Sequence, residues 1–526
     1  MASSIQLPLE QLLTTGGDTR LVIDGTSGRN RYGCLPRPDC ALPLGSCTSS
    51  TISQLGYEAA RDTHRHLVTA ADVQLAANQC AADIRQRLQQ LLNLPDGVDV
   101  ALGPSGTDVE LLALALAAGA ADRRIMNIVV GPTEVGSGTM LAAACRHYDS
   151  MTPGGQRVVA GECVDEKLAS LVDVRSVDLR TANGEMLSES EIDAAVIELV
   201  LEASERDMVV LLHIVAHSKT GVHAPSLSCV ERITKASDDV VVVVDAAQGR
   251  FSRRGLRDVL RKNYLVIFTG SKFYGGPPFS GALLVPPKLH PAKRKLGKLP
   301  AGFRDYFSAA EMPESWSEIR KSLAADSNIG GLLRWSAALS EMDGYYRVPS
   351  DARLRVLRFF EAEVPRVFAA SSMIRLLPVF SPLYDDTCKR LLQSKTTVFG
   401  FWVTSPGSRR PMGKSELQKL QADLASDVAS TFPDIDRQIA SQTFQIGQPV
   451  DLGVAGYVLR VALGGALITR VSTDKSFGES FDDRLNWLGD QLTSLRRKVE
   501  CLAGHSQRSE ESNMRRSELS AATMAR

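Results

Sequence analysis

The sequence has no excess of either charge, no long apolar run and no sign of a secretion signal. Its 60 Lys and Arg residues equal its 60 Asp and Glu residues, so no overall field favours nucleic acid or an anionic membrane. No apolar run reaches the roughly 20 residues that span a bilayer, and the N-terminus lacks the basic flank and long apolar core of a signal peptide. These absences predict a cytoplasmic protein that binds neither nucleic acid nor membrane.

Cysteine is sparse and follows no pattern. Nine cysteines are scattered along 526 residues, without a CxxC pair and without histidine at metal-ligand spacing. We therefore expect reduced thiols, no disulfide framework and no bound metal.

What the sequence does have is a large apolar fraction in an α/β pattern. A chain of this length with 44% hydrophobic residues can bury a large core in two or three domains. Short apolar runs alternate with longer amphipathic stretches, which predicts an α/β fold with a mainly parallel sheet. The predicted strands are 98–102, 125–131, 208–215, 240–244, 264–268 and 281–285.

The pattern changes after about residue 335, where strands and helices of a smaller α+β domain follow, ending in a helix with one apolar face. Within the first 60 residues, the stretch 24–53 is rich in Gly, Ser, Arg and Cys. It suits a loop that lines a cleft, where Arg29, Arg31 and Arg37 could meet an acidic substrate, and it suits an irregular surface segment equally well. We expect an N-terminal segment (1–60), a large domain (61–335), a small domain (336–503) and a disordered tail (504–526).

Two predicted strand ends carry the residues that point to chemistry. Asp245 ends the run "VVVVVD", and Lys272 follows the next strand in "TGSKFYG". The carboxyl ends of parallel strands are where open α/β sheets bind ligands. A lysine in a cleft of low dielectric has a lowered pKa and can form a Schiff base, although a lysine considered in isolation here is more often a surface residue in a turn. Together the two residues suggest pyridoxal phosphate (PLP), whose ring nitrogen pairs with a carboxylate and whose aldehyde reacts with an amine.

A third stretch supplies a phosphate site. Ser105, Gly106 and Thr107 lie between a predicted strand and a predicted helix, and the N-terminus of a helix favours an anion. Taken alone, this stretch is a common helix cap. The combination with Asp245 and Lys272 makes the prediction of a PLP site specific.

Over residues 60–335 the chain resembles fold-type I PLP enzymes of the class V aminotransferase and cysteine desulfurase group. "DAAQ" (245–248) and "TGSKFYGGPPFSGALLV" (269–285) carry the likeness. The resemblance implies a seven-stranded, mainly parallel sheet and a homodimer. It also implies roles for particular residues: Asp245 on the pyridine nitrogen, Gln248 near the ring hydroxyl, Lys272 as the Schiff-base lysine, and Thr269 and Ser271 near the phosphate.

Two weaker likenesses extend the site. "HIVAHSKTGVHAP" is similar to a segment that would bring His217 or Ser218 near the ring or the substrate, whereas His217 alone could be a polar residue in a turn. "GYVLRVALGG" resembles a late strand whose arginine pairs with the substrate carboxylate, which implies this role for Arg460. A guanidinium is well suited to a carboxylate, and a structural salt bridge is the alternative for Arg460.

Two differences from the sequence pattern of this group reduce the number of reactions that the resemblance allows. Val135 follows Glu134, where desulfurases of the group have a histidine that stacks on the ring, and no cysteine lies between Cys388 and Cys501. Desulfuration through a protein persulfide is therefore disfavoured. We predict an aminotransferase acting on an amino acid, with a PLP-dependent lyase or decarboxylase as the alternative and a catalytically silent relative as a remote one.

A nucleotide hydrolase is the remaining alternative, because "GSRRPMGKSE" (407–416) looks like a phosphate-binding loop. Five residues separate Gly407 from Gly413, whereas that loop requires four. A helix capping box from Ser415 to Gln418 explains the stretch without nucleotide.

Overall fold

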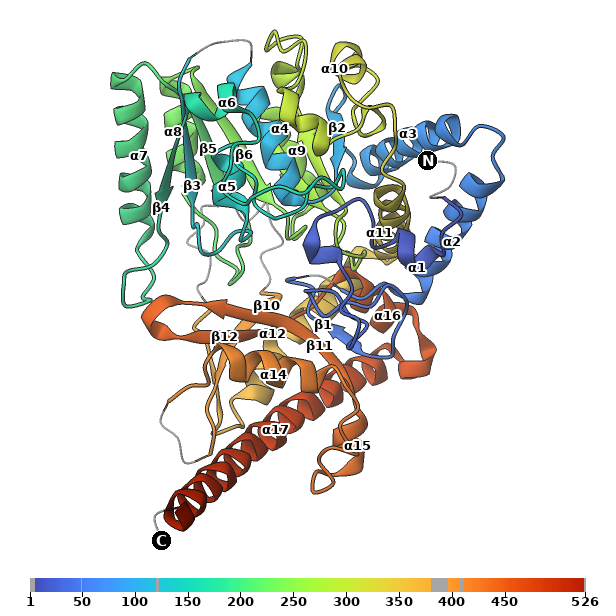
Figure 1. Ribbon diagram of the computed structural model, residues 1–526, viewed down its shortest axis with the longest axis vertical. Coiled ribbons are helices and arrows are strands. Elements are labelled where there is room, and N and C mark those ends of the chain that lie inside the picture. The colour runs from blue at the N-terminus through green and yellow to red at the C-terminus, as the bar shows by residue number, and fades with distance from the viewer. Residues whose placement is uncertain (1–4, 49, 120–122, 380–395, 407–409, 525–526) are drawn as a thin grey trace. The chain divides into compact units, whose positions relative to one another are not determined.

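The computed structural model of the chain describes residues 5–48, 50–119, 123–379, 396–406 and 410–524 (Figure 1). These residues form two compact units. The first contains 5–39 and 48–347, and the second contains 40–47, 348–379 and 396–524. The N-terminal segment is thus part of the first unit, apart from residues 40–47, and the first unit extends beyond the expected boundary at residue 335.

The first unit is built on a seven-stranded sheet. Strand β8 is antiparallel to both of its neighbours, β2 and β7, and all other neighbouring strands are parallel. The α/β class and the mainly parallel seven-stranded sheet are confirmed. The order is β2 (Asp99–Gly103), β8 (Gly281–Val285), β7 (Leu265–Thr269), β6 (Val240–Ala246), β5 (Val209–Val215), β3 (Ile125–Val130) and β4 (Val172–Val177).

The six strands predicted from apolar runs are all present, and the seventh, β4, was not predicted. It lies at the edge of the sheet, where Asp173 and Arg175 interrupt its apolar pattern. Edge strands need only partial burial, so their sequences lack the continuous apolar run that identifies a central parallel strand.

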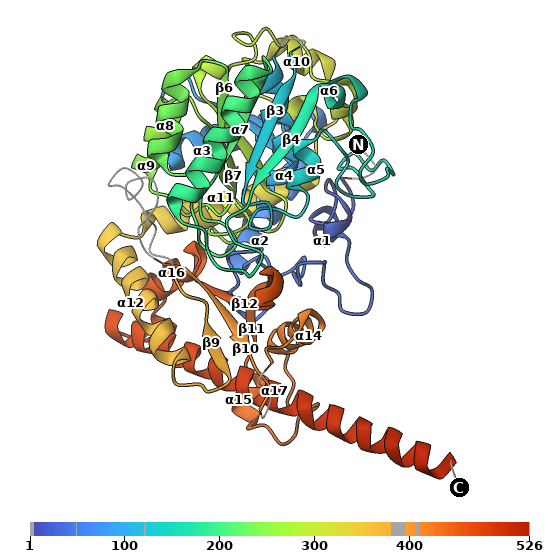
Figure 2. The same cartoon turned by 90° about the vertical axis from the view of Figure 1, so that its left-hand side faces the viewer.

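Helices cover both faces of this sheet (Figures 1 and 2). Helix α4 (Gly106–Ala118) is buried on all sides, between the sheet and a segment that contains Phe303 and Phe307. Helices α7 (Glu189–Glu205), α8 (Leu227–Ala236) and α9 (Arg253–Arg261) pack on the opposite face. The other helices of the unit are α1 (Leu9–Leu12), α2 (Gln54–Thr69), α3 (Val73–Leu92), α5 (Thr139–Ala143), α6 (Glu166–Leu171), α10 (Ser317–Ser322) and α11 (Ile329–Arg347).

The second unit has a five-stranded sheet, which is antiparallel except where β1 pairs with β11. Residues 40–47 belong to this unit because they contain β1. The strand order is β1 (Leu42–Leu44), β11 (Phe444–Asp451), β12 (Tyr457–Ala462), β10 (Val398–Val403) and β9 (Ile374–Leu376). The helices are α12 (Ser350–Phe368), α14 (Lys414–Leu424), α15 (Arg437–Ser441), α16 (Gly465–Thr473) and α17 (Phe481–Met524).

Helix α17 packs one apolar face, as predicted, and is longer than predicted. Leu488, Leu492 and Leu495 are fully buried against the rest of the unit. The backbone is helical to Met524, so the segment that we expected to be a disordered tail from residue 504 is helical through that residue. The Glu, Arg, Met and Ala residues of this segment have high helix propensity. The expectation of disorder considered only the polarity of the segment.

The predicted capping box of α14 is wrong. The helix begins at Lys414, one residue before Ser415, and the Gly413 backbone N–H donates to Glu416 Oε2 at 2.6 Å. Ser415 therefore lies within the first turn instead of capping it. Residues 407–409 of the loop-like stretch lie outside the described residues. Among the helices of the described chain, none is both long enough and apolar enough to cross a membrane.

Candidate functional site

The N-terminus of α4 lies at the carboxyl ends of β6 and β7. Ser105 caps the helix: its Oγ accepts from the Asp108 backbone N–H at 3.3 Å and donates to Asp108 Oδ2 at 2.5 Å. A Cβ added to Gly106 would lie 3.4 Å from Thr269 Cγ2 and 3.7 Å from Ala247 Cβ. These are ordinary contact distances for an added atom, so the first turn of α4 lies beside the ends of both strands.

Thr107 faces a second glycine-containing loop. A Cβ added to Gly136 would lie 3.4 Å from Thr107 Oγ1, and one added to Gly138 would lie 3.1 Å from Thr107 Cγ2. This loop follows Glu134 and precedes α5. The turn of Ser105, Gly106 and Thr107 therefore lies between the ends of β6 and β7 on one side and this glycine-containing loop on the other.

The turn that contains Lys272 begins where β7 ends. Thr269 Oγ1 donates to the Ala247 carbonyl at 2.6 Å, which links β7 to the end of β6. Thr269 and Ser271 are buried and Lys272 is half-buried. The Gly275 backbone N–H donates to the Lys272 carbonyl at 3.1 Å and closes the turn.

Asp245 lies in β6 and is half-buried. Its Oδ1 accepts from the Ala247 backbone N–H at 3.0 Å. Asp245 is paired in register with Ile267 of β7, and both Val243 and Ile267 pack in the core that contains α4. Since alternate residues of a strand share a face, Asp245 is on the side of the sheet that α4 covers. The structure thus brings Asp245, Thr269 and the start of α4 to one edge of one face.

Gln248 has a partner that the sequence analysis missed. Arg250 Nη1 donates to Gln248 Oε1 at 2.8 Å and to the Gln248 carbonyl at 3.2 Å, and both residues are buried. The Arg250 guanidinium also lies 5.4 Å from the ring centre of Phe273, the residue after Lys272. The arginine two residues after Gln248 was the available signal.

His217 is a buried histidine in a left-handed backbone conformation, with φ of 54°. Its ring meets the ring of His223 edge-on at 4.4 Å, and its backbone N–H donates to His223 Nδ1 at 3.2 Å. Burial and the positive charge of Arg250 lower the pKa of His217 to about 3. The ring is therefore neutral near pH 7, and its Nδ1 has no hydrogen-bond partner within the described residues.

Ser218 contacts a buried carboxylate instead of open space. Its Oγ donates to Glu134 Oε2 at 2.6 Å, and Thr220 Oγ1 and backbone N–H donate to the same carboxylate at 2.8 and 2.9 Å. Arg180 Nε and Nη2 donate to Glu134 Oε1, each at 3.2 Å. Because the Ser218 hydroxyl donates its hydrogen to Glu134, this serine helps to position the loop between Val215 and Ala224, two residues that form an isolated β-bridge.

Arg460 belongs to the second unit. It is buried in β12, and its Nε and Nη2 donate to the Gln448 carbonyl at 3.2 and 2.9 Å. Its expected contact with a substrate carboxylate stays a prediction, as does the alternative of a structural ion pair.

The N-terminal segment packs beside the first turn of α4. Arg20 forms a bidentate ion pair with Asp18, with Nε 2.8 Å from Oδ1 and Nη2 2.5 Å from Oδ2. Its guanidinium also lies 4.9 Å from the ring centre of Phe279. Burial and the negative charge of Asp18 raise the pKa of Asp108 to about 6. Of the three arginines that could meet an acidic substrate, Arg29 pairs with Asp39 at 3.5 Å.

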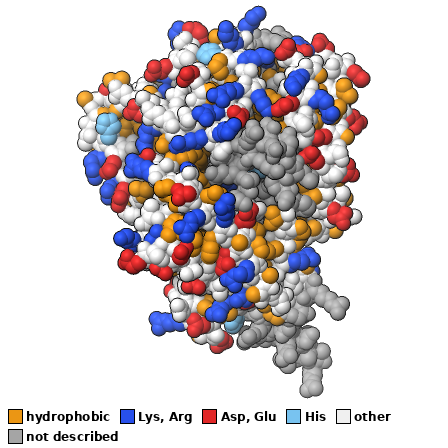
Figure 3. Space-filling view, turned by 180° about the vertical axis from the view of Figure 1, so that it is seen from behind, with side chains coloured by type: hydrophobic (Ala, Val, Ile, Leu, Met, Phe, Trp, Pro, Cys, Tyr) orange, Lys and Arg blue, Asp and Glu red, His pale blue; other side chains and the backbone are white. Residues whose placement is uncertain are grey.

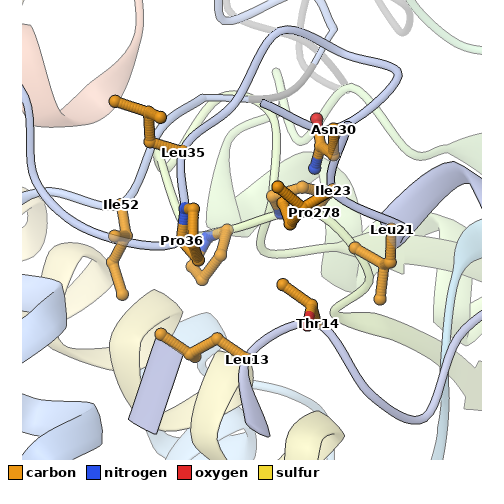
Figure 4. A pocket seen from close by; sticks show the side chains of 10 residues that line it. Leu13, Thr14, Leu21, Ile23, Asn30, Leu35, Pro36, Ile52 and Pro278 are labelled. Carbon is orange, nitrogen blue, oxygen red and sulfur yellow. The ribbon is translucent and has the colours of Figure 1, made fainter. Parts of the chain in front are cut away.

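A small cavity separates this segment from the turn after Lys272 (Figure 4). Its lining residues include Leu21 and Pro36 from the segment and Pro277 and Pro278 from the turn. The volume open to the centre of a water molecule is about 10 Å³, which admits one water at most. The segment therefore packs closely against this turn, and the cavity between them is too small for a ligand.

Comparisons with known proteins find similarity in structure alone. No protein-family model matches the chain, and no curated protein sequence matches it. A solved structure of a C-DES variant, with glycine covalently linked to its PLP cofactor, shares 13% sequence identity. The match covers 86% of this chain and 96% of that one, with a TM-score of 0.50.

Two further solved structures have a similar extent of match. A NifS-like protein has 14% identity and a TM-score of 0.48, covering 86% of this chain and 99% of that chain. The cysteine desulfurase CsdA from Escherichia coli has 15% identity and a TM-score of 0.48, covering 86% and 94%. The likeness to C-DES, together with the strand order above, shows the fold-type I architecture that the sequence predicted.

Proposed function

We propose that the chain is a PLP-dependent enzyme that acts on an amino acid through Lys272. One observation carries the proposal: an amine, a carboxylate and a helix N-terminus lie at the same edge of the sheet. Lys272 follows β7, Asp245 lies at the end of β6, and the first turn of α4 lies beside both strand ends. A fold shared with a PLP-containing protein supports the same proposal.

The residues present fit this cofactor. The first backbone N–H groups of a helix have no partner within the helix, so those of Gly106 and Thr107 can bind a phosphate. Asp245 accepts one backbone hydrogen bond, through Oδ1, and its half-buried position leaves the carboxylate accessible for a pyridine nitrogen. Bound PLP would supply an electron sink for the bond broken at the substrate α-carbon.

The roles of the chain's own residues follow from their chemistry. Lys272 Nζ would hold the cofactor through its aldehyde carbon and, once displaced by the substrate amine, would move a proton at the α-carbon. Asp245 would hold a proton on the ring nitrogen. Gln248 and Arg250 would border the ring, with Arg250 holding the amide of Gln248 in place. Arg460 would bind the substrate carboxylate.

Transamination is the reaction that we propose, because it requires only the lysine, the cofactor and a carboxylate anchor. A PLP-dependent lyase or decarboxylase uses the same parts and is the alternative. We further propose a cytoplasmic homodimer that binds neither nucleic acid nor membrane. The balanced charge supports the part of this proposal that concerns nucleic acid and membranes, and Lys, Arg, Asp and Glu side chains are all distributed over the face seen in Figure 3.

The test uses PLP-loaded protein and single amino acids, without a keto acid. Accumulation of pyridoxamine phosphate with one equivalent of keto acid, identified by mass spectrometry, would support transamination. Repeated turnover with PLP retained would contradict it and support the lyase. Lys272→Ala should abolish either outcome, whereas Lys288→Ala, whose side chain is 65% exposed and pairs with Asp238 on the surface, should not.

A further inference from the structure

An apolar cavity lies on the face of the seven-stranded sheet opposite to α4, between the strands and the helices α8 and α9. The volume open to the centre of a water molecule is about 40 Å³, against about 10 Å³ for the cavity in Figure 4. Its lining includes Ile214 of β5, Val244 of β6, Val266 of β7, Leu227 of α8, and Leu256 and Val259 of α9. Protein cores are close-packed and contain few voids larger than a water molecule, so a space of this size needs an explanation.

The side chains around this cavity suit an apolar occupant. Apart from His223, the described lining residues have aliphatic or aromatic side chains, and all of these are buried. A water molecule requires two to four polar partners in such a space, whereas apolar cavities stay dry and take up apolar molecules. The lining therefore favours a hydrocarbon group over ordered water.

His223 adds no charge to the cavity. Its Nδ1 accepts a hydrogen bond from the His217 backbone N–H at 3.2 Å. Burial lowers the pKa of His223 well below its usual range, and the neighbouring His217 adds to this shift, so the ring is neutral near pH 7. None of the described lining residues is then charged. A charged ligand would lose its hydration here without an opposite charge to compensate.

The cavity is separate from the proposed cofactor site. Val244 and Ala246, which line it, are the residues on either side of Asp245 in β6. Since successive residues of a strand point to opposite faces, the cavity and Asp245 are on opposite sides of the sheet. We propose that this cavity is a binding site for an uncharged hydrophobic molecule about the size of a benzene ring. The site goes beyond the proposed function and does not depend on it.

The test compares two probes that share a fluorinated ring and differ in charge. Fluorine NMR titration of the full-length protein with fluorobenzene should give a dissociation constant below about 1 mM. The charged probe 4-fluorobenzylammonium should bind at least about tenfold more weakly. Val259→Met extends a flexible side chain into the cavity and should weaken fluorobenzene binding about tenfold. Leu256→Phe serves as a second variant if the first does not fold, with the same expectation.

The controls show whether the probe occupies this cavity. Val159→Met makes the same substitution at a side chain that is 59% exposed and is not among the described lining residues, so it should leave fluorobenzene binding unchanged. Addition of PLP should also leave it unchanged, because the two sites are on opposite faces of the sheet. Failure of the wild-type protein to bind fluorobenzene, displacement of the probe by PLP, or undiminished binding by Val259→Met would overturn the inference. A protein that binds fluorobenzene but no PLP would contradict the proposed function alone.

Discussion

Replacing Arg334 by methionine should loosen the N-terminal segment, at residues 13–16, from helix α11. Arg334 lies in α11, is fully buried, and donates hydrogen bonds to four backbone carbonyls. Three belong to the N-terminal segment, at 3.1 Å (Leu13), 2.6 Å (Thr15) and 3.2 Å (Gly16), and the fourth, at 2.8 Å, is that of Phe279 in the turn after Lys272. One guanidinium thus joins α11 to both segments.

The expected cost follows from those four hydrogen bonds. Each buried carbonyl left without a donor costs about 1–3 kcal/mol, although some will be rehydrated. Burial of the guanidinium is itself unfavourable and lowers the pKa of Arg334 to about 9, which offsets part of the loss. We therefore expect Arg334→Met to lower the free energy of unfolding by about 3 kcal/mol.

Urea unfolding and amide hydrogen exchange test this prediction. Exchange should accelerate most at residues 12–16, which the arginine holds. Arg347→Met on the same helix is the matched control, because that side chain is 78% exposed and pairs only within the helix with Asp343 in the interactions described, and it should change stability by less than about 0.5 kcal/mol. A loss below about 1 kcal/mol for Arg334→Met, with unchanged exchange, would refute the reasoning.

Three further predictions concern the site. Gly281→Ala would bring a Cβ within 2.4 Å of the Ser105 carbonyl carbon, so it should lower the melting temperature and weaken PLP binding, whereas Gly106→Ala meets no atom closer than 3.4 Å and should fold normally in the same thermal assay. For Asp108, the folded-state pKa of about 6 exceeds the unfolded value, so stability should fall by about 3 kcal/mol as pH rises from about 4 to 6. Asp108→Asn should lack this fall in urea unfolding, and an identical slope would contradict the assignment. For His217, the folded-state pKa of about 3 is below the unfolded value, so its contribution to stability is lost as pH falls from about 6.5 to 3. His217→Asn should remove that loss, and retention of it would show that another group is responsible.

The sequence predicted the parts of the site that depend on strand ends. Asp245 and Lys272 could be found because a long apolar run identifies a central parallel strand, and the residues after it must lie at the ligand-binding edge. The turn from Ser105 to Thr107 could be found because cap residues precede helices. These patterns are local, and each is visible in a few consecutive residues.

The parts that depend on contacts between distant residues could not be predicted. Glu134 is bound by Arg180 and Thr220, which lie far from it in the chain, and no periodicity joins them. The pairing of β1 with β11 brings together segments near opposite ends of the sequence through only three residues. His213 is surrounded by apolar residues in an ordinary strand pattern, and only the fold shows that Glu110 faces it.

The most direct test of the account asks which residue holds PLP. The protein is incubated with PLP, reduced with borohydride and digested, and the peptides are sequenced by mass spectrometry. The account predicts a single phosphopyridoxyl group, attached to Lys272 in the peptide that contains "TGSKFYG". Attachment to a different lysine, or an unmodified Lys272 after saturation with PLP, would contradict it.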